Sequence, residues 1–193
     1  MTTIILTRHG ETDWNREGRW QGHSNTSLNE LGRKQARQLA DELEGEVEVV
    51  YSSYLARARE TAEIVAERLG LEVEVDSRLR ERGFGSWEGL THPEVEERDA
   101  EALARWRAGE GYGARDAEPH DAFAERVSRF LQDVLERHPG ERVLVITHGG
   151  SMRVIHALVR GLDYVRDRGA IPAVENCAVA KYAARDGKLA PID

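Results

Sequence analysis

An uninterrupted apolar run at residues 143–146, Val-Leu-Val-Ile, constrains the fold of this chain more than any other feature of its sequence. A strand with one face in water alternates apolar and polar residues, whereas a strand buried on both faces does not. The run ends at Thr147-His148-Gly149-Gly150, and the residues that follow favour a helix to about Arg160. The pattern therefore predicts a central strand, covered on both sides by helices, with a histidine at its carboxyl end.

Strand patterns and helix patterns alternate along the rest of the chain. The predicted strands are residues 4–7, 47–51, 71–75 and 178–183. The predicted helices begin at Asn29, span 55–69 before Gly70, and span 120–137. Such alternation predicts an α/β fold, a three-layer α/β/α sandwich with a mostly parallel central sheet.

Two local signals refine these boundaries. Ser52 and Ser53 follow the second strand and are expected to cap the next helix, because serine oxygens accept amide hydrogens at helix starts. Asp186-Gly187 indicates a hairpin before a last edge strand.

The length and composition favour one domain over residues 1–193, because 193 residues of which 40% are hydrophobic suffice for a single core. Residues 80–118 are less regular and rich in glycine. We expect a helical insertion or lid there, at about residues 85–120, over one end of the sheet.

The charge and cysteine content exclude several classes of partner. With 35 acidic and 27 basic residues the net charge is −8, which disfavours binding to nucleic acid or to an anionic membrane. Cys177 is the only cysteine, so an internal disulfide is impossible.

No signal-peptide pattern or membrane-spanning run is evident, and a cytoplasmic location is expected. The histidines show no metal-ligand spacing, and neither a metal nor a cofactor is predicted; the oligomeric state is not predicted.

Three strand ends carry residues of one chemistry. The first strand delivers Arg8 and His9, the second leads to Arg57, and the central strand delivers His148. The carboxyl ends of parallel strands meet at one edge of a sheet, where ligands bind. Two arginines and two histidines would repel one another there without an anion. A phosphoryl group fits, because it accepts several charge-assisted hydrogen bonds and matches the arginine fork.

Residues 6–15, Leu-Thr-Arg-His-Gly-Glu-Thr-Asp-Trp-Asn, resemble the signature of the histidine phosphatase superfamily, which includes the cofactor-dependent phosphoglycerate mutases. The resemblance continues in family order through most of the chain. Further matching blocks are residues 19–22, 28–32, 53–62, 79–81, 84–89 and 145–150. A lone Arg-His-Gly would be a weak signal, whereas several ordered blocks are a strong one.

The resemblance implies specific roles for the residues at the strand ends. His9 would be the nucleophile that becomes phosphohistidine, and Glu81 the acid for the leaving alkoxide and then the base for water. The transferred phosphoryl group would be held by Arg8, Asn15, Arg57 and His148. The catalytic candidates are therefore His9, Glu81, His148 and Arg8. This chemistry needs no metal. Possible substrate-cleft residues are Gln21, Gly22 and Trp87.

Two positions leave alternatives open. Glu81 lies among Arg78, Arg80 and Arg82, and a surface cluster of ion pairs would have the same sequence pattern. Many relatives carry Gly-Glu-Ser before the penultimate helix, where this chain has Ala117-Glu118-Pro119. Glu118 matches the glutamate, but the serine is replaced, so a role of this segment in the substrate cleft is left open.

Residues 82–89 after Glu81 resemble the small phosphatases more than the mutases, and His92 stands where mutases usually have a lysine. The predicted function is a metal-independent phosphomonoesterase that acts on small phosphorylated metabolites through phosphohistidine. The alternatives are a cofactor-dependent phosphoglycerate mutase and a non-catalytic phosphate-binding regulatory protein. Substrate specificity is assigned to the insertion over the active site.

Overall fold

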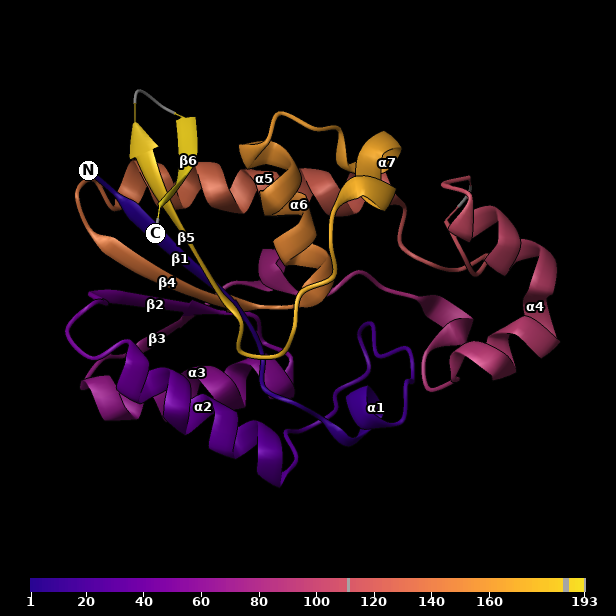
Figure 1. Ribbon diagram of the computed structural model, residues 1–193, viewed down its shortest axis with the longest axis horizontal. Helices are drawn as coiled ribbons and strands as arrows, with labels where there is room; N and C mark the ends of the chain where they lie inside the picture. Colours follow the sequence, from indigo (N-terminus) through magenta and orange to yellow (C-terminus); the bar gives the residue numbers. More distant parts are fainter. Residues whose placement is uncertain (111, 186–187, 193) are drawn as a thin grey trace.

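The computed structural model describes residues 1–110, 112–185 and 188–192, and its centre is a six-stranded sheet in the order β3-β2-β4-β1-β5-β6 (Figure 1). The strands are β1 Thr3–Arg8, β2 Val49–Ser52, β3 Val73–Val75, β4 Arg142–Thr147, β5 Val179–Arg185 and β6 Lys188–Ile192. The first four are paired in parallel, while β5 runs antiparallel to β1 and β6 antiparallel to β5. The mostly parallel sheet predicted from the sequence is confirmed.

The apolar run at residues 143–146 lies in β4, between β2 and β1. Val143 and Val145 belong to one hydrophobic core, and Leu144 and Ile146 to the other. The run lacks alternation because both faces of the strand are buried.

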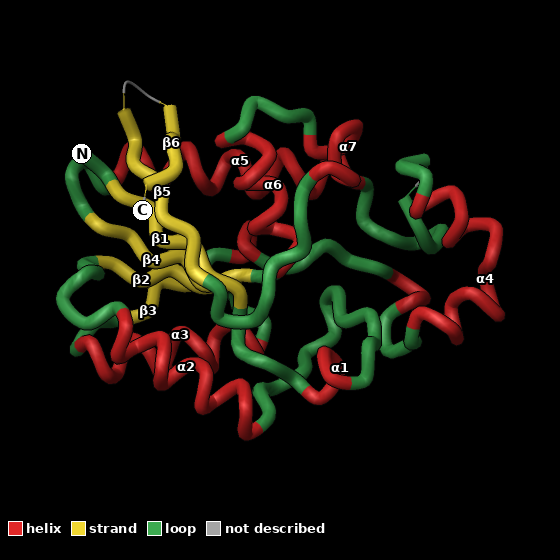
Figure 2. The backbone as a smooth tube through the Cα atoms, viewed as in Figure 1, coloured by secondary structure: helices red, strands yellow, loops and turns green. Residues whose placement is uncertain are grey.

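Helices cover both faces of the sheet (Figures 1 and 2). One face packs against α2 Glu30–Glu42 and α3 Ala56–Leu69, and the other against α5 His120–Arg137 and α6 Gly149–Val159. The three-layer α/β/α sandwich is therefore confirmed. The shorter helices are α1 Asp13–Arg16, α7 Tyr164–Asp167 and 3-10 turns at Ser77–Leu79, Gly85–Trp87 and Arg168–Ala170. Among the described residues, no helix has the length and apolar character needed to cross a membrane.

The insertion between β3 and α5 contains α4 His92–Arg107 and has a small core of its own. That core is built from Trp20, Trp87, Val95, Leu103 and Ala114. Trp20 also lines the cavity at the sheet edge, so the predicted helical insertion stands directly beside the site.

The predicted serine cap of α3 is wrong. The N-cap is Leu55, which makes no side-chain cap, and the Ser53 hydroxyl accepts from the Leu55 amide at 3.2 Å. The helix begins later than the serines, and the Ala56 amide donates instead to Asn25 Oδ1 at 2.7 Å. One of the backbone amides that have no partner within the first turn of the helix is thus bonded by a loop residue distant in sequence. The hairpin signal Asp186-Gly187 lies outside the described residues; the strands on either side of it pair antiparallel.

Candidate active site

His9 directly follows β1, and its two ring nitrogens have different surroundings: Nδ1 contacts the backbone, and Nε2 contacts a side chain of the site. Its Nδ1 lies 2.7 Å from the carbonyl oxygen of Gly10. Because a carbonyl only accepts, Nδ1 carries the proton and Nε2 keeps its lone pair. Burial lowers the pKa of His9 well below its ordinary value of 6.5, with further lowering by Arg57 and Arg8. The ring is therefore a neutral imidazole near pH 7, the form that can act as a nucleophile.

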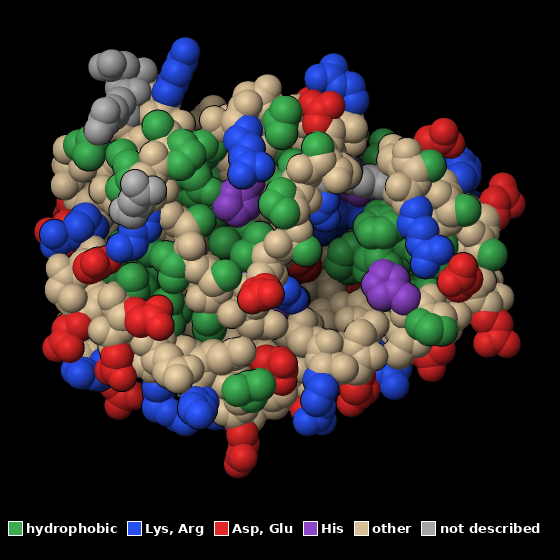
Figure 3. All heavy atoms as spheres, in the orientation of Figure 1, with side chains coloured by type: hydrophobic (Ala, Val, Ile, Leu, Met, Phe, Trp, Pro, Cys, Tyr) green, Lys and Arg blue, Asp and Glu red, His purple; other side chains and the backbone are tan. Residues whose placement is uncertain are grey.

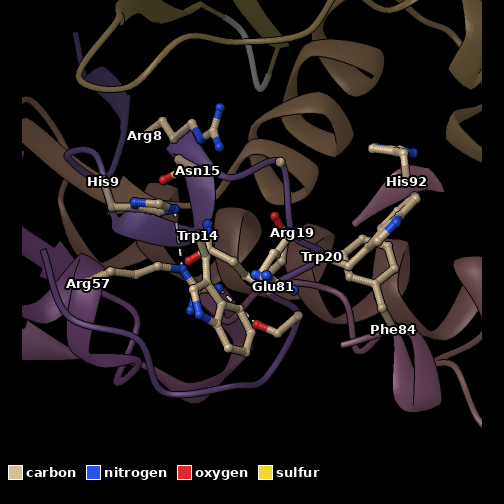
Figure 4. Close-up of a pocket in the computed structure, with 13 residues that line it drawn as sticks. Arg8, His9, Trp14, Asn15, Arg19, Trp20, Arg57, Glu81, Phe84 and His92 are labelled. Atoms are coloured by element: carbon tan, nitrogen blue, oxygen red, sulfur yellow. Dashed lines mark hydrogen bonds between the residues drawn. The ribbon is translucent and has the colours of Figure 1, made fainter. Parts of the chain in front are cut away.

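Arg57, the second residue of α3, holds a cationic group against Nε2 of His9. Its Nε donates to His9 Nε2 at 3.2 Å, while its Nη1 and Nη2 donate to the carbonyls of Ser24 and Gly22, each at 2.8 Å (Figure 4). Burial lowers the pKa of Arg57 to about 10, so it stays charged at neutral pH. The three bonds point in three directions and fix the plane of the guanidinium.

Arg8 and His148 place buried nitrogens close to His9, and some of these nitrogens have no hydrogen-bond partner in the described residues. Arg8 Nη1 donates to the Val174 carbonyl at 2.7 Å, but its buried Nε has no partner among the described residues. Both ring nitrogens of the fully buried His148 also lack one in the described part of the chain. An unsatisfied buried polar group costs about 1–3 kcal/mol. Such groups are therefore candidates to bind water or a ligand.

His148 lies beside His9 because β1 and β4 are paired in register, Arg8 opposite Thr147. The two ring centroids are 5.2 Å apart. Burial lowers the pKa of His148 well below 6.5, with Arg57 and His9 adding to the effect, so this ring is neutral as well. The net charge of the group comes from the two arginines, and it suits an oxyanion.

A cavity of about 220 Å³ opens at these residues. Figure 4 shows Arg8, His9, Asn15 and Arg57 on one side of it and Trp20, Phe84 and His92 on the other. In Figure 3 the surface is hollowed between the body that carries the sheet and the part that carries α4. The lining residues are Arg8, His9, Trp14, Asn15, Gly18, Arg19, Trp20, Gln21, Gly22, Arg57, Glu81, Phe84 and His92.

Two amide side chains are held through their oxygens at this cavity. Asn15 Oδ1 accepts from the Thr12 amide at 3.1 Å, and Gln21 Oε1 accepts from the Thr12 and Thr26 hydroxyls at 3.0 and 2.6 Å. With the oxygens engaged, the NH₂ ends are the groups left for a ligand. Gly22 must be glycine, because its φ is +50° and an added Cβ would lie 2.1 Å from Glu88 Oε1.

Glu81 contributes the carboxylate of the cavity. Its Oε1 accepts from the Arg82 amide at 2.8 Å and its Oε2 from the Gly150 amide at 3.0 Å. Other carboxylates make the ion pairs of this stretch: Asp76 contacts Arg78 at 2.7 Å, and Glu118 contacts Arg80 at 3.7 Å. Glu118 also pairs with Arg126 of α5 at 2.7 Å. The Glu118 segment therefore braces the loop that carries Glu81, and Glu81 faces the cavity.

One residue predicted to line the cleft lies outside the cavity, and several residues that were not predicted line it. Trp87, expected along the cleft, is only 1% exposed and donates through Nε1 to Asp99 Oδ2 at 2.9 Å, so it belongs to the core of the insertion. The cavity wall is formed by other residues that the sequence reasoning did not assign, namely Trp14, Arg19, Trp20, Phe84 and His92. Trp20 could have been found, because it directly precedes Gln21-Gly22 in a matching block.

No group of three or more His, Cys, Asp or Glu side chains suited to hold a metal ion occurs in the described part of the chain. The fold and the site define an α/β protein in which a neutral histidine lies beside two arginines, an arrangement suited to an oxyanion. Comparisons with known proteins make the class specific.

The model of the histidine phosphatase superfamily, branch 1, matches residues 4–190. Phosphoglycerate mutase-like protein 4 of Arabidopsis thaliana is 40% identical over 166 residues, which is 81% of this chain and 70% of that protein. The metal-independent phosphoserine phosphatase of the same plant is 40% identical over 165 residues, 81% of this chain and 68% of its own length. A mycobacterial glucosyl-3-phosphoglycerate phosphatase, solved in complex with VO₃, superposes with a TM-score of 0.89 at 31% identity, covering 98% of this chain and 96% of that one.

The chain belongs to the histidine phosphatase superfamily. Within it the chain is a phosphatase, and the family and activity class expected from the sequence are confirmed.

Proposed function

We propose that this protein hydrolyses small phosphate monoesters by forming phosphohistidine at Nε2 of His9. The observation that carries the proposal is the arrangement of His9: a neutral ring with its lone pair on Nε2, between two arginines. Buried donors without partners in the described residues are available to an anion at Nε2: Arg8 Nε and the one ring N–H of the neutral His148.

In the first step the phosphate ester takes over the Arg57 Nε–H hydrogen bond from His9 Nε2. The freed Nε2 lone pair attacks phosphorus, and the bond from phosphorus to the leaving oxygen breaks. Glu81 acts as the general acid and gives a proton to the leaving oxygen, which departs as an alcohol. Arg8, Arg57 and the Asn15 amide stabilise the charge that spreads over the equatorial oxygens in the transition state.

In the second step a water molecule attacks the phosphohistidine, and the bond from Nε2 to phosphorus breaks. The Glu81 carboxylate takes the water proton, inorganic phosphate leaves, and His9 returns as a neutral ring. Two displacements at an activated nitrogen replace one slow hydrolysis.

The substrate class follows from the space beyond the phosphate site. A second cavity of about 240 Å³ shares Arg8, Trp20 and Glu81 with the first and adds Arg82 and Arg153 to its wall. Three arginines and one carboxylate thus line this cavity, in a chain of net charge −8. We infer from this local excess of positive charge that the leaving group carries an anion of its own, such as a carboxylate. Relatives named for phosphoserine and for glucosyl-3-phosphoglycerate support this, because both compounds contain a carboxylate.

The test is a matched pair of substrates, O-phosphoserine and O-phosphoethanolamine, assayed for phosphate release with EDTA present. The two differ by one carboxylate, and we expect kcat/KM to favour phosphoserine by at least about tenfold, the value of one charge-assisted hydrogen bond of about 1.5 kcal/mol. Arg153→Gln should reduce the preference. Equal kcat/KM values for the two substrates would contradict the proposal that the leaving group is anionic.

Mutase activity beside hydrolysis is the second candidate, because a 40% identical relative is named as mutase-like. Isomerisation of 3-phosphoglycerate in the presence of 2,3-bisphosphoglycerate, assayed in parallel with phosphate release, measures that activity. Isomerisation faster than phosphate release would show that transfer to a second hydroxyl dominates over hydrolysis. Tight binding of phosphate esters without either reaction would favour a regulatory binding protein.

A further inference from the structure

The segment before β5, residues 174–177, is bonded to the strand that carries the nucleophile; we call it the return segment. The Val174 carbonyl accepts from Arg8 Nη1 at 2.7 Å, and the Cys177 amide donates to the Arg8 carbonyl at 2.9 Å. Asn176 Nδ2 donates to the His9 carbonyl at 2.8 Å and contacts Asn15 Oδ1 at 3.4 Å. One short segment thus contacts three residues of the phosphate site.

The topology explains why this segment reaches the site. Because β5 runs antiparallel to β1, the residues that precede β5 lie at the edge where β1 ends. The rule that ligands bind beyond carboxyl ends of parallel strands does not include these residues. The approach of the return segment is therefore a feature of the antiparallel strand.

The hydrogen bonds fix the orientation of both amide side chains. The His9 carbonyl can only accept, so the atom of Asn176 that faces it is the nitrogen. The Thr12 backbone amide can only donate, so the atom of Asn15 that faces it is the oxygen. Asn15 Oδ1 is held by Thr12 on one side and by Asn176 on the other, which leaves the Asn15 NH₂ for the cavity that this residue lines.

The backbone of the return segment is strained in a way that serves this contact. Cys177 has a φ of 56°, the only positive value among the described non-glycine residues. A left-handed conformation is unfavourable for a residue with a side chain and persists only where surrounding contacts hold it. At Cys177 the holding contact is its own amide bond to Arg8, and the turn places Asn176 over the His9 carbonyl.

We infer that Asn176 is a positioning residue for phosphoryl transfer: it orients the Asn15 amide and holds the main chain of His9 at the distance the attack requires. This role rests on the proposed function, since it acts on the phosphate held against His9. Asn176 itself does not line the cavity, so it works through its two partners.

The experiment is a double-mutant cycle of Asn15→Ala and Asn176→Ala, read out as the rate of phosphohistidine formation in a rapid-quench single turnover. Asn176→Ala alone should slow that step by about 10- to 100-fold, the loss expected when a reacting group is misplaced. In the Asn15→Ala background the same substitution should cost clearly less, because one of its two targets is gone. Thermal unfolding of each variant shows whether the fold is intact.

Asn176→Asp is the second variant. It preserves the shape of the side chain but cannot donate to the His9 carbonyl, so it should be as slow as Asn176→Ala. Wild-type rates in Asn176→Asp, or equal losses from Asn176→Ala in both backgrounds, would overturn the positioning role while the wild-type enzyme still forms phosphohistidine. Failure of the wild-type enzyme to form phosphohistidine would overturn the proposed function, and this role with it.

Discussion

Arg57 shows at the scale of one residue how the site depends on shape as well as charge. Its guanidinium reaches His9 through Nε and two loop carbonyls through its other nitrogens. A lysine would place a single charge on a flexible stem and could not hold these three directions at once.

We therefore expect Arg57→Lys to lower kcat/KM by about 100-fold, the loss that follows removal of one preorganised donor. Arg59→Lys is the matched control on the same helix, because Arg59 is exposed and pairs only with Glu63 at 2.8 Å in the described structure. Steady-state assays of both variants test this. An Arg57→Lys enzyme with activity near that of the control would contradict the account.

The residues at strand ends could be predicted from the sequence, whereas residues that depend on long-range packing could not. Arg8, His9, Arg57 and His148 follow parallel strands, and one topological rule brings them together. Trp87 was placed wrongly because burial inside the insertion depends on α4, whose packing no local pattern reveals. Asn176 was missed because it precedes an antiparallel strand.

At the scale of elements, two glycines let α2 approach the loop that follows the nucleophile. A Cβ on Gly32 would lie 2.1 Å from the Glu11 carbonyl oxygen, and one on Gly10 would lie 2.5 Å from the Gly32 carbonyl oxygen. Gly10 also accepts from His9 Nδ1 and donates to Thr61 Oγ1 at 3.0 Å. The start of α2 is thus in backbone contact with the group that sets the His9 tautomer.

Gly32→Ala should reduce the free energy of unfolding by about 1–3 kcal/mol, because the helix must move to admit the methyl group and overpacking outweighs the gain in helix propensity. It should also lower kcat by disturbing Gly10. Gly169→Ala is the control, since nothing lies within 4 Å of a Cβ there. Urea unfolding and steady-state kinetics measure both effects; equal behaviour of the two variants would show that the close approach is unimportant.

The order of helices and strands was predictable because each element has its own spacing of apolar residues in the sequence. The residues at which the elements begin and end were harder to predict. The unbroken run of β4 and the apolar stripe of α3 are local signals that tertiary structure reinforces. The cap of α3 was not predictable, because Asn25 satisfies its first turn from a loop that is distant in sequence.

At the scale of the whole molecule, two histidines of the site are buried in neutral form. Burial is the main cause that lowers the pKa of His9 and of His148 well below 6.5. In the unfolded chain these rings take up protons as the pH falls below 6.5, while in the folded chain they do so only at lower pH. The unfolded state then binds more protons, and stability must fall with falling pH.

We expect the free energy of unfolding to decrease between pH 7 and pH 5, by up to about 1.4 kcal/mol per pH unit for each of the two buried rings, His9 and His148. Asp76 and Glu118 contribute at lower pH, because hydrogen bonds and charge from Arg78 and Arg126 outweigh burial and lower their pKa values from 3.8 and 4.5. Urea unfolding across this range tests the expectation. A flat profile would contradict it, and a variant with both His9 and His148 replaced by asparagine should have a shallower one.

The central claim is that His9 carries the phosphoryl group, and trapping that group tests it most directly. The enzyme is mixed with radiolabelled phosphoserine, quenched in alkali, where phosphohistidine is stable, and digested for mass spectrometry. The account predicts label on His9, lost in acid and absent from His9→Ala, which should also lose turnover while keeping its fold. Substantial turnover by His9→Ala, or label on another residue, would contradict it.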